Sequence, residues 1–238
     1  MKKIVFTISL LLCWTVASAQ IDFSQLRLGA RAGFGVGMVD AKFEDDDTES
    51  QAGVQLFLGA AAELPVWKFI RVTGEVLFEH TWVSDESNTM YMTGATAYDA
   101  TIFRKVKITY PLNYIHIPIM ARACFVKDFV YVEAGPQFGF LVGKVKSHTE
   151  GTQTTKPNTP LAPSQVVKID EDSDDTDNYK KTYAGWVLGW GGNFGHERQF
   201  SAGIRVGIGL NDLQDPDHKL DGVRVTHSDV QISMRYWF

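Results

Sequence analysis

The chain has 238 residues and a formal net charge of −5, from 23 Lys and Arg against 28 Asp and Glu side chains. This acidic balance argues against nucleic acid as a partner and against a basic surface for lipid head groups. No stretch approaches roughly 18 consecutive apolar residues, the length typical of a membrane-spanning helix. A membrane protein with this sequence therefore has to cross the bilayer as a closed barrel.

The N-terminus has the three parts of a secretory signal peptide. A basic start at Lys2-Lys3 precedes an apolar run over 4–12, and residues 17–19 (A-S-A) match a small-residue cleavage site. We expect cleavage between Ala19 and Gln20. The predicted organisation is a signal peptide over 1–19 and one barrel domain over 20–238.

Period-2 alternation of apolar residues predicts eight strands in the remaining chain. The seventh is among the clearest, because Phe200, Ala202, Ile204, Val206, Ile208 and Leu210 oppose Ser201, Gly203, Arg205, Gly207 and Gly209. Most of the strands are long enough to cross a bilayer obliquely. The expected strands are 27–38, 54–64, 69–82, 113–125, 129–145, 183–194, 200–210 and 228–238.

The connections between these strands alternate in length, as in outer-membrane barrels with short periplasmic turns and long extracellular loops. With both termini in the periplasm, every connection lies on the side that its length predicts. The expected short turns are 65–68, 126–128 and 195–199, and the expected long loops are 39–53, 83–112, 146–182 and 211–227.

The alternation changes phase near the start of the fourth strand. Ile108, Tyr110 and Leu112 share one parity, whereas Ile115, Ile117 and Ile119 share the other. Two explanations fit: a bulge near Pro111 or Asn113, or a strand extension over 106–112 that lies above the membrane.

The strands of a soluble barrel or sandwich also alternate. The composition of the second face of the strands therefore distinguishes a soluble protein from a membrane barrel. That face is largely Gly, Ser and Thr with few charges, which makes a poor solvated surface but a suitable barrel interior. Opposite charges there are nearly balanced, as expected if buried charges are paired. The predicted interior charge network is Arg27, Arg31, Glu63, Arg71, Glu75, Glu79, Arg122, Glu133, Arg205 and Arg235.

Aromatic residues gather at the strand ends beside the short turns, where a periplasmic interface girdle belongs. They are Trp67, Phe69, Phe125, Phe129, Phe194, Phe200, Tyr236, Trp237 and Phe238. Eight strands leave an interior filled by side chains, so a diffusion pore is not expected. The fold class is therefore an all-β, eight-stranded, up-and-down antiparallel outer-membrane barrel.

Three segments resemble the PorT-like outer-membrane β-barrel family of Bacteroidetes-type bacteria. They are Y-I-H-I-P-I-M-A-R at 114–122, Y-V-E-A-G-P-Q-F-G at 131–139 and G-I-R-V-G-I-G-L-N-D-L at 203–213. The resemblance implies a signal peptide, eight antiparallel strands and an aromatic final strand. It also implies that Tyr236 and Phe238 belong to a signal read by the barrel-assembly machinery, and that a role in type IX secretion or gliding is possible by analogy.

Candidate chemistry is sparse. The acidic runs at 44–49 and 170–177 do not match an EF-hand, and we interpret them as solvated loops rather than calcium sites. We expect His116 to be the only histidine inside the barrel. His80, His227, Ser228 and Asp229 are candidates for an outer-rim catalytic group, but no nucleophile–base pair is supported.

These observations favour a structural or interaction protein without cofactor, metal or catalytic residues. The expected partners are outer-membrane lipid, the assembly machinery and an envelope or secretion protein. The alternatives are an accessory component of type IX secretion and a small enzyme acting on lipid or peptide. Loop 83–112 is apolar enough to bind a partner or to fold over the barrel mouth.

Overall fold

The computed structural model describes residues 23–43, 48–93, 100–157, 163–215, 217 and 223–238. The predicted signal peptide, its cleavage pair Ala19 and Gln20, and most of the acidic run 44–49 lie outside these residues. The described part contains no helix that is long and apolar enough to span a membrane.

The strands are β1 (Arg27–Phe43), β2 (Thr48–Pro65), β3 (Ile70–Thr93), β4 (Ala100–Phe125), β5 (Val130–Leu141), β6 (Lys146–Pro157), β7 (Gln165–Asp174), β8 (Thr182–Phe194), β9 (Phe200–Gly209) and β10 (Val223–Trp237), with 3₁₀ turns η1 (Phe23–Gln25), η2 (Thr176–Asn178) and η3 (His196–Arg198).

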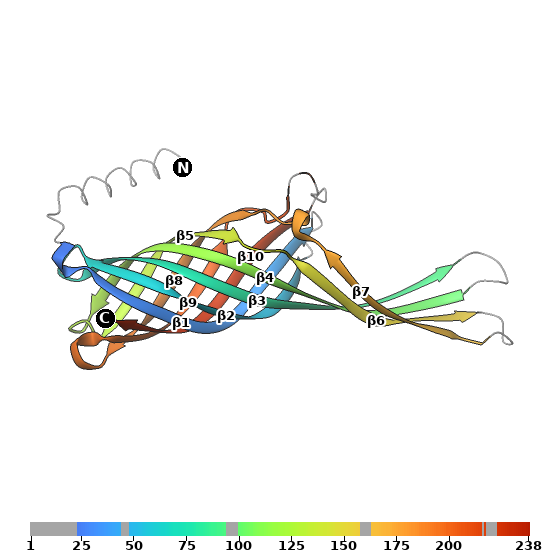
Figure 1. The fold of residues 1–238 in the computed structure, drawn as a ribbon, viewed down its shortest axis with the longest axis horizontal. Coiled ribbons are helices and arrows are strands. Elements are labelled where there is room, and N and C mark those ends of the chain that lie inside the picture. Colours follow the sequence, from blue (N-terminus) through green and yellow to red (C-terminus); the bar gives the residue numbers. More distant parts are fainter. Residues whose placement is uncertain (1–22, 44–47, 94–99, 158–162, 216, 218–222) are drawn as a thin grey trace.

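Eight of the strands form a closed antiparallel ring. Its order is β3-β2-β1-β10-β9-β8-β5-β4, and the pairing of β3 with β4 closes it. The last strand pairs with the first from Gly29↔Trp237 to Phe43↔Val223. The ring is visible as the cylinder at the left of Figure 1. It confirms the predicted eight-stranded, up-and-down barrel.

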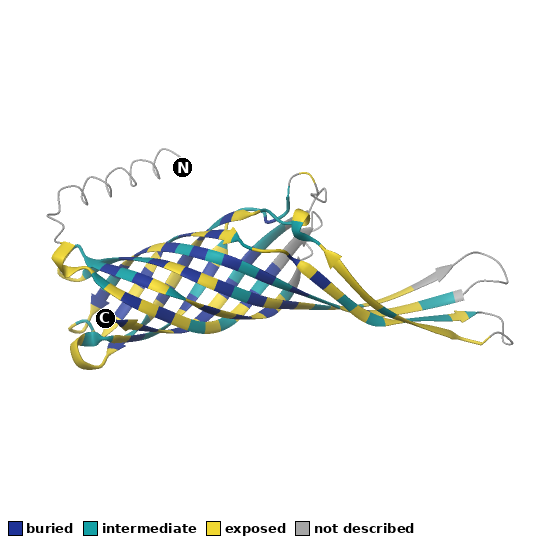
Figure 2. Ribbon diagram, viewed as in Figure 1, coloured by how far each residue is buried: buried dark blue, intermediate teal, exposed yellow. Residues whose placement is uncertain are grey.

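The two faces of the barrel wall have the polarity expected for a lipid environment. Burial alternates residue by residue along the strands (Figure 2). The exposed positions on the outside carry large apolar side chains such as Leu58, Val76 and Trp186, whereas the buried positions include Arg31, Glu75 and many other polar groups. A soluble barrel would show the reverse arrangement.

The long segments 83–112 and 146–182, predicted to be loops, are mostly strand, so that prediction is wrong. β3 and β4 continue beyond the ring as a paired hairpin up to Thr93↔Ala100. The hairpin β6–β7 adds to the upper part of β4 from Thr109↔His148 to Ala100↔Pro157. The result is a four-stranded sheet in the order β3-β4-β6-β7, here called the outer extension, which projects away from the barrel (Figure 1).

The sequence hid these strands because both of their faces are polar. β6 and β7 carry threonines and charges on either side, so the apolar alternation that identified the barrel strands is absent. The predicted loop 39–53 is also mainly strand, since β1 runs to Phe43 and β2 starts at Thr48. The hairpin 83–112 does not fold over the barrel mouth.

The phase change at the start of the fourth predicted strand is not a bulge. The β3–β4 register is the same on both sides of Pro111, with Trp82↔Pro111 and Leu77↔His116. The strand extension over 106–112 is therefore the correct explanation. Tyr110 and Leu112 are buried inside the wall, whereas Ile119 lies outside and is half exposed. The apolar face changes sides because this part of β4 leaves the lipid.

An apolar cluster closes the end of the barrel beside the extension. It combines wall residues with one residue from each of two connections, Val145 before β6 and Leu213 before β10. We call this cluster the apolar lid; its buried members are Val39, Val83, Tyr110, Leu112, Tyr114, Val145, Tyr183 and Leu213.

Candidate functional site

The predicted charge network lies inside the barrel, and Glu75 on β3 is its centre. Its carboxylate accepts hydrogen bonds from Arg31 at 2.8 Å, from Arg205 at 2.7 and 2.9 Å, and from Arg235 at 2.6 Å. All four side chains are buried. Three cations around one carboxylate hold β1, β3, β9 and β10 together across the interior.

Two further carboxylates extend this network toward the short-turn end. Glu133 pairs with Arg205 at 2.5 Å and with Arg122 at 2.7 Å, and Arg122 also reaches Glu63 at 2.9 Å. Arg71 donates to Glu63 at 2.8 Å. We call these residues, with Arg27, the arginine layer. Its members are Arg27, Arg31, Glu63, Arg71, Glu75, Arg122, Glu133, Arg205 and Arg235.

Arg27 is the member with the weakest contact to a carboxylate. It lies 3.9 Å from Glu63 and is partly exposed at the barrel end. Its guanidinium instead donates to the Arg198 carbonyl at 3.2 Å and lies over the Trp237 ring. The structure thus brings nine of the ten predicted network residues into one connected group.

Trp237 is buried, so its assignment to the interface girdle is wrong. Its ring also lies within 6 Å of the guanidinium carbons of Arg122 and Arg235, and its Nε1 donates to Ser201 Oγ at 3.3 Å. Trp237 therefore fills the short-turn end of the interior. The other eight residues proposed for the girdle are exposed.

Glu79, the tenth predicted network residue, lies apart from the arginines. Its carboxylate accepts hydrogen bonds from Gln55 at 3.1 Å, Gln231 at 3.3 Å and Thr81 at 3.3 Å. His116 Nε2 is 3.8 Å away. This region lies between the arginine layer and the apolar lid.

The prediction that His116 is the only histidine inside the barrel is wrong, because His227 is also buried there. His227 Nδ1 lies 3.9 Å from Asp229 Oδ2. The two histidine rings and those of Tyr114 and Tyr183 contact one another at 5.4–6.4 Å between centroids. We call this group the histidine layer; its members are Gln55, Glu79, Tyr114, His116, Gln137, Tyr183, His227 and Asp229.

The predicted outer-rim assembly is not formed. His80 lies on the outer face of β3, where its Nδ1 is 2.5 Å from Asn113 Oδ1 and its ring contacts Trp82. His227 and Asp229 point to the interior, on the other side of the wall. His80 and His227 therefore cannot act on one substrate.

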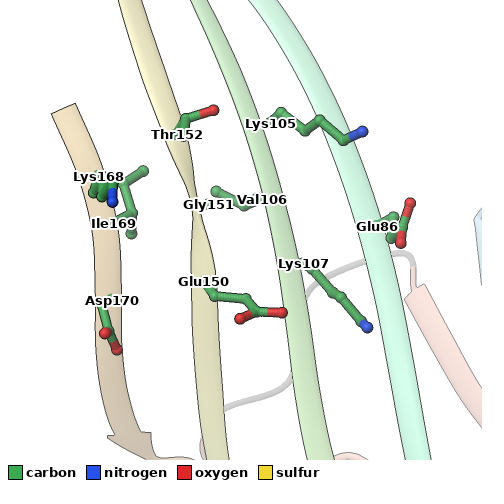
Figure 3. A pocket seen from close by; sticks show the side chains of 10 residues that line it. All are labelled: Glu86, Lys105, Val106, Lys107, Glu150, Gly151, Thr152, Lys168, Ile169 and Asp170. Atoms are coloured by element: carbon green, nitrogen blue, oxygen red, sulfur yellow. The ribbon is translucent and has the colours of Figure 1, made fainter. Parts of the chain in front are cut away.

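The outer extension has a shallow groove of about 510 Å³ on one face. The backbone of Val106, Gly151 and Ile169 separates two cross-strand rows of side chains (Figure 3). One row contains Lys105, Thr152 and Lys168, and the other contains Glu86, Lys107, Glu150 and Asp170. The face is therefore charged but has no dominant sign.

The acidic run 170–177, predicted to be a loop, forms the end of β7 and the turn η2. Asp174 accepts hydrogen bonds from Thr176 Oγ1 at 2.6 Å and from Lys144 at 2.9 Å, and these bonds lower its pKa to about 2. Asp172 lies 2.9 Å from His148 Nδ1, and this contact raises the pKa of His148. Within the described chain, no three His, Cys, Asp or Glu side chains are arranged to hold a metal ion.

A ring of eight strands with an apolar exterior and a charged, filled interior defines a transmembrane β-barrel. The chain belongs to the outer membrane protein beta-barrel domain family, which matches residues 18–215. Membership in this family places the protein in the outer membrane. No curated protein matches the chain. The match is to this broad family, so the PorT-like assignment stays a prediction.

Several solved structures are similar to the chain, all at low sequence identity. Ail of Yersinia pestis is 12% identical, with 88% of this chain and 99% of that one covered and a TM-score of 0.36. The Neisserial surface protein A is 11% identical, with coverage of 90% and 97% and a TM-score of 0.32. The outer membrane protease OmpT from Escherichia coli is 6% identical, with coverage of 94% and 100% and a TM-score of 0.31.

Proposed function

We propose that this protein is a non-conducting outer-membrane scaffold that presents the outer extension outside the cell for binding to a partner macromolecule. The observation that carries the proposal is the continuity of β3 and β4 from the barrel into the extension. Between Ser84 and Thr93, β3 adds ten residues, which is roughly 33 Å at about 3.3 Å per residue. Strands rooted in a membrane barrel hold such a sheet away from the lipid surface.

Three levels of filling support the absence of a pore. Trp237 occupies the short-turn end, the arginine layer crosses the middle, and the apolar lid closes the far end. Ion pairs between opposite walls occupy the interior of a ring of only eight strands, which supports the proposal that solutes do not pass. The short turns at one end and the extension at the other favour periplasmic termini and an extracellular sheet.

The open edges of the extension support a binding role. Beyond the pair Gly53↔Val83, no described strand pairs with this edge of β3, apart from a side-chain bond from Gln51 to Asp85, and none pairs with the outer edge of β7. Unpaired strand edges are templates for association with another chain. Exposed Met90 and Val166 on one face and Val167 on the other add apolar contact area near the tip.

The pore question is tested with the purified mature barrel in planar bilayers. We expect no steady conductance at any applied voltage. Sustained, large single-channel steps that persist after repeated purification would contradict the non-conducting part of the proposal.

The binding role is tested by trimming the extension without touching the lid. Short turns would replace 86–107 and 148–172, leaving the register pairs Asp85↔Ile108 and Ser147↔Ser173 to close each hairpin. Heat-modifiable gel migration checks that the trimmed barrel folds. We then expect cross-linking in intact outer membranes to yield partner proteins with the full chain and to lose them with the trimmed one. Identical partners from both would remove the extension from the function.

The type IX secretion role implied by the PorT resemblance stays a separate prediction. No contact described above favours it over a general binding scaffold. Deleting the gene and measuring secreted cargo tests it directly, and intact secretion would rule it out.

A further inference from the structure

The charges of the barrel interior are compensated in one layer and not in the other. In the arginine layer, each of Glu63, Glu75 and Glu133 contacts at least two guanidinium groups. In the histidine layer, Glu79 and Asp229 contact none among the described side chains. Both carboxyl groups are buried. Buried carboxylates without a cation are costly, so this layer requires a further explanation.

The two imidazoles lie near these carboxyl groups but make no hydrogen bond to them. Gln137 Nε2 lies 2.9 Å from His116 Nδ1. Tyr183 OH lies beside the same ring at 3.2–3.3 Å. The His116–Glu79 and His227–Asp229 distances, 3.8 and 3.9 Å, exceed hydrogen-bonding range, and each contact is an ion pair only when its imidazole is protonated.

Three buried polar atoms of the layer have no hydrogen-bond partner. They are Gln55 Oε1, Asp229 Oδ2 and Tyr114 OH. Two of the three are obligatory acceptors, and buried acceptors are normally satisfied. Among the described side chains, none donates to these atoms: Arg31 donates through its two terminal nitrogens to Glu75 and Gln231, and its Nε is also without a partner.

The space around Asp229 is shaped for its carboxylate. On the neighbouring strand β9, a Cβ at Gly207 would lie 2.6 Å from Asp229 Oδ2, so any other residue there would require the Asp229 side chain to move. The apolar lid covers the layer from the side of the extension, since Tyr114 and Tyr183 belong to both. The layer is therefore a buried polar region whose two carboxyl groups contact no arginine or lysine among the described side chains.

We propose that the histidine layer binds one small positive charge, as a proton held by Glu79 and Asp229 or as an alkali cation among the unfilled acceptors. A multivalent metal fits poorly, because no three metal-binding side chains converge in the described chain. The proton is the better fit, since a proton on Asp229 turns its unpartnered Oδ2 from an acceptor into a donor.

Unfolding of the refolded mature barrel in lipid tests the proposal. Over the pH range in which the folded state holds one proton that the unfolded state has released, the unfolding equilibrium constant rises about tenfold per pH unit. The contribution of other groups is removed by comparison with a Glu79→Gln/Asp229→Asn double variant. A Glu171→Gln variant on the extension serves as the control and should keep the wild-type pH profile.

Repeating the measurement at constant ionic strength with sodium, potassium or the bulky cation N-methylglucamine shows whether the bound positive charge is a proton or an alkali cation. A pH dependence that the double variant loses identifies the proton. Stabilisation by sodium or potassium that the double variant loses identifies an alkali cation. If the wild type and the double variant respond equally to pH and to all three cations, the proposal is wrong.

An infrared measurement keeps the proposal testable if the double variant does not fold. A protonated carboxyl band in the wild type at neutral pH should disappear in Glu79→Gln or in Asp229→Asn alone. Its absence from the wild type, together with no effect of alkali cations on the unfolding midpoint, would also overturn the proposal.

Discussion

The barrel and the outer extension are built from the same two strands, yet they obey different rules. Below Val83, β3 places Thr73, Glu75 and Glu79 in a closed interior and apolar side chains against lipid. Above it, the sheet has no enclosed core, and charged side chains occupy both faces. One continuous backbone ladder therefore carries two surface patterns, and the surrounding medium determines which one appears.

The difference has an energetic consequence. A buried ion pair that loses one partner leaves an uncompensated charge in a medium that cannot solvate it. An exposed pair on the extension is screened by water and contributes little. Equivalent substitutions in the two regions should therefore have unequal effects.

The largest effect is expected for Glu75→Gln. Three guanidiniums would lose their shared carboxylate, and breaking a buried network of this kind costs about 3–5 kcal/mol. We expect the variant to refold poorly and to unfold at lower denaturant concentration, measured by heat-modifiable migration. Glu171→Gln on β7 is the matched control, with a change within about 0.5 kcal/mol. Equal stability of the two variants would contradict the expectation that charge removal costs more in the barrel than in the outer extension.

A smaller effect is expected for Leu213→Ala in the apolar lid. Leu213 is buried, and truncating a buried leucine costs about 2–5 kcal/mol through lost contacts and a residual cavity. Val166→Ala, at an exposed site on the extension, should change stability by less than about 0.5 kcal/mol. Denaturant unfolding of both variants measures the difference. A Leu213 variant as stable as the wild type would show that the lid does not contribute to the fold.

The sequence predicted the barrel well because lipid imposes a strict alternation on every spanning strand. Phe200 to Leu210 is readable for this reason. Beyond the membrane that constraint ends, so the sequence pattern predicts loops where β6 and β7 form. Their strand character depends on pairing with β4, a contact between distant segments that a local pattern does not contain.

The interior was predicted in part for a related reason. Arginine and glutamate on the inner parity are identifiable from sequence, so the arginine layer was foreseen. The sequence predicts the histidine layer only in part: Glu79 and His116 are expected inside, but His227 lies one residue before the predicted start of the last strand at 228. His227 has the same parity as Gln231 and Arg235, and this signal could have placed it inside. Trp237 shares that parity too, but its aromatic character suggested the girdle instead.

Deletion of Phe238 separates assembly from stability. The residue is 78% exposed, and its main tie to the barrel is a hydrogen bond from its backbone N–H to the Leu28 carbonyl at 2.8 Å. Losing one such bond costs about 1 kcal/mol. We expect a small shift in the unfolding midpoint but a marked loss of inserted protein in cells, measured in outer-membrane fractions. Normal insertion of the truncated chain would argue against Phe238 as part of the assembly signal.

The smallest effect is expected for the exposed pair of His148 and Asp172 on the extension. The nearby carboxylate raises the pKa of His148, so the pair stabilises β6 against β7 at pH values below the ordinary histidine pKa. That contribution is lost as pH rises through the raised pKa. Because water screens the pair, global stability should hardly change, but the His148 ring resonance should titrate at higher pH than in Asp172→Asn. The same titration midpoint in both proteins would mean that the contact does not persist in solution, and the hairpin would then be held by its backbone ladder and by the bonds around Asp174 alone.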